Sequence, residues 1–77
     1  MERRDEMKEE ENLISGLLKE IQRVREMIPE YESLPKNAGL FAATMMKLDV
    51  INAEKAMSEN DTIDMIKSYN ALKGYEN

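Results

Sequence analysis

Residues 39–57 read GLFAATMMKLDVINAEKAM, a stretch that has no proline and a glycine only at its first position. Placed on a helix at about 100° per residue, its apolar side chains spread over most of the circumference and do not form one stripe. Clearly polar edges are formed only by Lys47 with Glu54 and by Thr44 with Lys55. Because a helix that is apolar nearly all round is normally buried on more than one side, we expect a central helix packed by other segments of this chain and by a second chain.

The segment before this helix carries apolar residues at the a and d positions of a heptad: Ile14, Leu17, Ile21, Val24 and Ile28. This spacing predicts an amphipathic helix over 13–28, preceded by a charged extension of the same helix over 1–12. Gly16 lies off this seam, where we expect it to cost about 1 kcal/mol relative to alanine. Two filled heptads are too few to decide whether the seam packs on its own domain or faces another chain, so both alternatives stay open.

Pro29 should end the first helix, because its ring clashes with the preceding turn and it has no N–H to donate. Residues 29–37 then form a connector, and the central helix covers 38–58. The sequence SENDT at 58–62 is made of cap formers and predicts a short C-terminal helix over 61–73. The inner face of that helix is predicted to consist of Ile63, Ile66, Tyr69 and Leu72, with Met65 beside them.

The whole chain of 77 residues is therefore predicted to be a single all-α domain of three helices, with no strand pattern and no internal repeat. A core of this size supplies little net stability, so such domains usually depend on disulfides, a metal or oligomerisation. The chain has no cysteine and no histidine, which leaves self-association. We expect a helical-bundle homo-oligomer, with a dimer as the first choice.

The net charge of −5 opposes binding to duplex DNA and to anionic membrane surfaces, both of which need basic residues. No apolar run is long enough to span a membrane, and the N-terminal dozen residues do not form a signal peptide. These features predict a cytoplasmic protein without nucleic-acid or membrane partners.

No enzyme is expected from this sequence. It has no histidine to act as a base, no glycine-rich phosphate loop, no nucleophile elbow and no metal-ligand spacing. Glu59, Asp61 and Asp64 are interpreted as helix-capping residues, because the glycine and the glutamate that a calcium loop requires are missing. We therefore predict no catalytic residue, no cofactor and no metal ligand.

Nine apolar residues are predicted to form the oligomer or partner interface: Ile14, Leu17, Ile21, Val24, Ile28, Phe41, Met45, Met46 and Leu48. Asp49 and Asn52 are polar residues inside the apolar sector of the central helix. A buried polar side chain needs a hydrogen-bond partner, so they are candidates for an inter-chain pair that fixes register. The alternative is that this sector is partly open to water.

These features favour a small acidic protein-interaction module, such as an adaptor, inhibitor or antagonist of a protein target, acting as a homo-oligomer. We expect a compact acidic protein of this kind to be encoded by a phage or mobile element. The alternative is a helical oligomer that sequesters a small anionic ligand, such as a nucleotide, between subunits. The residues suited to hold that anion are Lys36, Thr44, Lys47 and Lys55. No stretch matches a motif specific enough to name a family.

Overall fold

The structure, a computed structural model, describes the backbone of residues 2–75 and the side chains of residues 12–75. Its elements are α1 (Glu2–Glu32), the short 3-10 turn η1 (Pro35–Asn37), α2 (Leu40–Ser58) and α3 (Thr62–Lys73). No strand occurs within residues 2–75. The prediction of an all-α chain with three helices is confirmed, whereas the side chains of the charged extension up to residue 11 lie outside the described residues.

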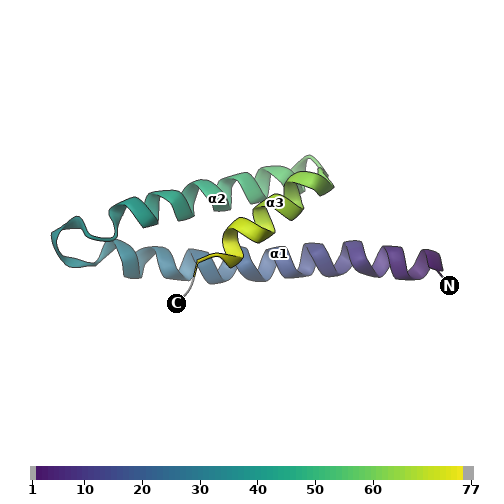
Figure 1. The fold of residues 1–77 in the computed structure, drawn as a ribbon, viewed down its shortest axis with the longest axis horizontal. Helices are drawn as coiled ribbons and strands as arrows, with labels where there is room; N and C mark the ends of the chain where they lie inside the picture. Colours follow the sequence, from purple (N-terminus) through teal and green to yellow (C-terminus); the bar gives the residue numbers. More distant parts are fainter. Residues whose placement is uncertain (1, 76–77) are drawn as a thin grey trace.

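The helices α1 and α2 run antiparallel, and α3 packs across both of them (Figure 1). The molecule measures 55 × 21 × 14 Å, and the long dimension follows α1. The N-terminal turns of α1 extend beyond the part of the helix that α2 and α3 cover (Figure 1). Among the described side chains of α1, the first that packs against the core is Leu13.

All three helices contribute to one apolar core. Its buried members are Leu17, Ile21, Val24 and Met27 from α1, Met46, Val50, Ala53 and Ala56 from α2, and Met65 and Leu72 from α3. The α1 residues follow the heptad spacing of the sequence, so the amphipathic face of α1 packs within its own chain. Alanine at two α2 positions lets the neighbouring helices approach closely, since the interaxial distance depends on the side chains at the contact.

The predicted end of the first helix at Pro29 is wrong, because α1 continues through this residue to Glu32. The turn after the proline keeps a backbone hydrogen bond, from Ser33 N to Pro29 O at 3.0 Å. Ile28 and Tyr31 in this turn are partly buried against the core. Their packing offsets the cost of a helix-interior proline, which is about 3 kcal/mol.

The connection from α1 to α2 is correspondingly short and tight. Lys36 and Asn37 both adopt left-handed backbone conformations, with φ of 58° and 61°. A Cβ atom at Gly39 would lie 2.0 Å from the backbone oxygen of Tyr31. Only glycine allows this close approach, and α2 begins directly after it, at Leu40 rather than at the predicted residue 38.

The third helix begins with the predicted type of cap. The side chain of Asp61 accepts a hydrogen bond of 3.1 Å from the backbone N–H of Asp64. This arrangement satisfies one of the free N–H groups at the helix start. The geometry thus shows a capping role for the side chain of Asp61.

The predicted inner face of α3 is wrong in part. Its buried residues are Met65, Ser68 and Leu72, whereas Ile63 is 67% exposed and Ile66 is 47% exposed. The small Ser68 and the absence of a side chain at Gly16 allow α3 to approach α1 on this face. Tyr69 takes up that space, since a Cβ atom at Gly16 would lie 3.2 Å from its ring. Close packing of α3 against α1 therefore decides which face of α3 is buried. The larger side chains of Ile63 and Ile66 remain exposed to solvent.

Candidate functional site

The helix α2 carries two parallel rows of residues on opposite sides. The inner row faces the core and contains Ala43, Met46, Val50, Ala53 and Met57. The second row, called here the outer stripe, contains Phe41, Thr44, Leu48, Ile51 and Lys55. Both rows have the alternating spacing of three and four residues that is typical of a helix–helix seam. At 100° per residue the two rows lie roughly 160–200° apart.

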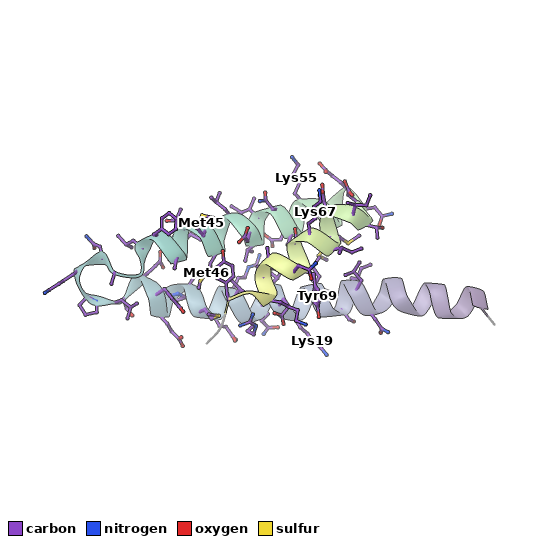
Figure 2. All side chains as sticks on the ribbon, viewed as in Figure 1. Lys19, Met45, Met46, Lys55, Lys67 and Tyr69 are labelled. Atoms are coloured by element: carbon purple, nitrogen blue, oxygen red, sulfur yellow. The ribbon has the colours of Figure 1, made fainter. Side chains whose placement is uncertain are left out.

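The apolar members of the outer stripe are exposed to solvent. Phe41 is 79% exposed, Ile51 57% and Leu48 49%. Leu40 and Met45 flank the outer stripe and are exposed as well. Figure 2 shows that Met46 points toward α1 whereas its neighbour Met45 lies on another side of α2. Together with the flanking Leu40 and Met45, these side chains gather exposed apolar surface on one side of α2, and such a patch indicates an interaction surface.

The structure places four of the nine predicted interface residues inside the chain's own core: Leu17, Ile21, Val24 and Met46. This corrects the expectation that they face a second chain. Both α2 and α3 pack on the heptad face of α1, so its seam is already covered within one chain. Of the other predicted residues on α1, Ile28 is partly buried against the core and Ile14 is exposed.

The remaining three predicted interface residues, Phe41, Met45 and Leu48, lie on or beside the outer stripe. The sequence prediction missed Leu40 and Ile51, which belong to the same exposed surface. The alternating spacing of three and four residues along the outer stripe would have been enough to predict Ile51.

The inter-chain register pair predicted for Asp49 and Asn52 stays a prediction, but Asp49 already has a partner within its own chain. Tyr75 Oη donates a hydrogen bond of 2.5 Å to Asp49 Oδ2, whereas Asn52 is exposed on α2. Burial and this hydrogen bond raise the pKa of Tyr75 to about 12. The carboxylate of Asp49 therefore has a hydrogen-bond partner within its own subunit. It does not need one from a second chain.

The four residues suited to an anion are not gathered in one place. Lys47 pairs with Glu32 at 2.6 Å, and the hydroxyl of Thr44 donates to the backbone oxygen of Leu40. Lys36 lies in the turn before α2. Lys55 lines a hollow between α2 and α3 together with Asn52, Ala56, Glu59, Asp64, Lys67 and Ser68. Two lysines and two acids in that hollow balance in charge, so the geometry gives the anion alternative no support.

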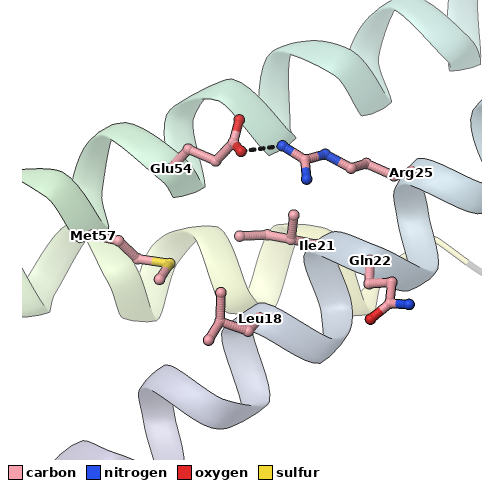
Figure 3. Close-up of a pocket in the computed structure, with 6 residues that line it drawn as sticks. All are labelled: Leu18, Ile21, Gln22, Arg25, Glu54 and Met57. Atoms are coloured by element: carbon pink, nitrogen blue, oxygen red, sulfur yellow. Dashed lines mark hydrogen bonds and ion pairs between the residues drawn. The ribbon is translucent and has the colours of Figure 1, made fainter.

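A shallow groove between α1 and α2 is the second surface feature (Figure 3). It has a volume of about 380 Å³ and is lined by Leu18, Ile21, Gln22, Arg25, Glu54 and Met57. An ion pair between Arg25 and Glu54 spans the groove from one helix to the other. Its lining consists of three apolar side chains, Gln22 and the paired Arg25 and Glu54, which form no constellation suited to catalysis.

Within residues 12–75, no three acidic side chains come together in a way that could hold a metal ion. None of the helices in this part of the chain combines the length and the apolar character needed to cross a membrane. Among the described residues, the outer stripe of α2 carries the exposed apolar side chains with helix–helix seam spacing.

Comparison with protein-family models, with curated proteins and with solved structures gives no match to this chain. The function must therefore be argued from the surface of the chain itself.

Proposed function

We propose that this chain is a small acidic helical interaction module that acts as a homo-oligomer, in the simplest case a dimer. Its work is to bind a protein target as an adaptor, inhibitor or antagonist. The observation that supports this proposal is the outer stripe of α2, an exposed apolar row directly opposite the core.

Solvent exposure of the outer stripe is costly for a chain of this size. Each Å² of apolar surface removed from water contributes about 25 cal/mol, and Phe41, Leu48 and Ile51 keep about half or more of their surface exposed. A globular helix normally has one apolar stripe and one polar face. A second chain covering the outer stripe would bring α2 to the two-sided burial that its composition favours.

The charged faces are the surfaces left for a target once the outer stripe is covered. The chain carries 16 acidic residues against 11 basic ones. Several basic side chains are already held by acids in the same subunit, as Lys47 is by Glu32 and Arg25 is by Glu54. An acidic surface of this kind steers association with a basic target and can occlude it. The mechanism is steric blocking or mimicry of an acidic ligand, with no chemical step.

The test is the mass of outer-stripe variants in solution. Phe41→Ser and Leu48→Ser remove exposed apolar side chains and should convert the oligomer to a folded monomer. Ile63→Ser is the matched control, since Ile63 lies on α3 and its exposure of 67% falls between those of Leu48 and Phe41. It should leave the oligomer intact in sedimentation velocity. Equal behaviour of Ile63→Ser and the two α2 variants would remove the support for the proposal.

A further inference from the structure

We infer that two copies of the chain pair through their outer stripes, with the two α2 helices antiparallel about a two-fold axis that passes beside Leu48. This inference rests on the proposed self-association. It goes further by assigning the occupant of the outer stripe, the direction of the paired helices and their register.

The spacing of the outer stripe fits a second helix of the same length. Its residues run from Phe41 to Lys55, about 21 Å at 1.5 Å per residue. With the axis beside Leu48, this residue faces its own copy. Ile51 then lies opposite the partner's Thr44, so that a large side chain meets a small one. On the other side of the contact between the two α2 helices, Met45 lies opposite the partner's Asn52.

Charge distinguishes the antiparallel from the parallel arrangement. In a parallel pair, Lys55 would face the partner's Lys55, and like charges directly opposite each other are destabilising. In the antiparallel pair, Lys55 lies over the ring of the partner's Phe41, where an ammonium group is attracted by the aromatic face. Antiparallel helices also place opposite ends of their dipoles side by side.

Charge also favours a second copy as the occupant of this surface. The five positions of the outer stripe contain no acidic residue, although the chain carries 16 of them. Glu54 lies at the edge of α2 beside the groove and is paired with Arg25 of its own subunit. Two chains of net charge −5 can therefore meet on this face with little repulsion.

The apolar area available indicates a reversible dimer. With side chains of this size and exposure, the contact buries on the order of 1,000 Å² in total, at or below the lower end of stable interfaces. The dimer should therefore dissociate on dilution.

The experiment uses the absence of cysteine from the chain, so that a single introduced thiol reports one position. Leu48→Cys should give a cross-linked dimer with an oxidant or with a short thiol-reactive linker, because the two copies meet at the axis. Phe41→Cys alone should not cross-link, since its two copies are separated by about 21 Å along the helices, beyond the reach of a disulfide. A mixture of Phe41→Cys and Lys55→Cys should cross-link as a mixed pair.

Efficient cross-linking of Phe41→Cys to itself would show a parallel pair and overturn the inference, while leaving self-association intact. A dimeric unmodified chain whose Leu48→Cys variant stays uncrosslinked would place the contact elsewhere, for example on the exposed face of α3, and would also overturn it. A chain that is monomeric at every concentration would remove both this inference and the proposed homo-oligomer.

Discussion

The guanidinium group of Arg23 lies at the C-terminal end of α3, where its Nη2 atom donates a hydrogen bond of 2.9 Å to the backbone oxygen of Leu72. The same group pairs with Glu20 of α1 at 2.9 Å. The last carbonyl groups of a helix lack partners within the helix and carry partial negative charge. One side chain of α1 therefore both caps α3 and balances its dipole, which fixes where this short helix docks.

Replacement of Arg23 by alanine should destabilise the fold by about 1.5–3 kcal/mol, the usual contribution of a hydrogen bond to a charged group. Arg25→Ala is the control, because its ion pair with Glu54 is exposed and should contribute at most about 1 kcal/mol. Urea unfolding followed by circular dichroism measures both variants. Equal losses of stability would show that Arg23 is not a specific cap.

Gly39→Ala should be among the most damaging small substitutions in the chain. Its Cβ atom would meet the backbone oxygen of Tyr31 at 2.0 Å, and backbone cannot move aside as a side chain can. We expect a loss of more than about 2 kcal/mol, since overpacking usually costs about 1–3 kcal/mol and here the contact is with backbone. Gly74→Ala should change the stability by less than about 1 kcal/mol, because Gly74 has an ordinary helical φ of −68°. A Gly39→Ala variant as stable as the parent would contradict the geometry of this turn.

Stability should fall at high pH because of Tyr75. Its pKa is raised from 10.0 to about 12 in the folded chain, first by burial and then by the hydrogen bond to Asp49. Between these values the unfolded chain loses the phenolic proton while the folded chain keeps it. The stabilisation is therefore complete below pH 10 and is lost as the pH rises toward 12.

Tyr75→Phe removes this titration, so its free energy of unfolding should depend less on pH over this range than that of the parent chain. Comparison of the two chains cancels the contribution of every group that both share. Parallel stability curves from pH 9 to pH 12 would show that Tyr75 titrates normally.

An acidic residue at the centre of the outer stripe should oppose self-association. Leu48→Glu places two like charges at the two-fold axis and should raise the dissociation constant at least tenfold, which corresponds to about 1.4 kcal/mol. Folding should change little because Leu48 is 49% exposed. Ile66→Glu, on the exposed face of α3, is the matched control and should leave the dissociation constant unchanged in sedimentation equilibrium. A comparable loss of association in both variants would point to a general effect of charge.

Features encoded over short distances could be predicted from the sequence. The heptad spacing of Leu17, Ile21 and Val24 predicts a helix with one apolar face, and these residues are buried. The cap at Asp61 depends on a partner three residues away, so the local sequence was sufficient to predict it.

Features that depend on distant contacts could not be predicted. Helix propensity predicts that the first helix ends at Pro29, but the helix continues to Glu32. Propensity does not account for the packing of Ile28 and Tyr31 against the core. The contact of Tyr69 with Gly16 joins positions more than 50 residues apart. A helical-wheel analysis of α3 favours the large isoleucines for the inner face, whereas the fold selects the face that allows the closest approach.

The candidate site was predictable only in part for the same reason. The sequence shows that α2 is apolar on several sides, but it cannot assign which side the same chain covers. Met46 faces the core and Met45 does not, although they are adjacent and chemically identical. The tertiary fold makes this distinction and leaves the outer stripe uncovered within one subunit.

The most direct measurement for the central claim is the absolute mass of the unmodified chain by light scattering, over a wide range of concentrations. The account predicts a mass of twice 8.9 kDa at high concentration, which falls toward 8.9 kDa on dilution. A constant mass of 8.9 kDa at every concentration would contradict it.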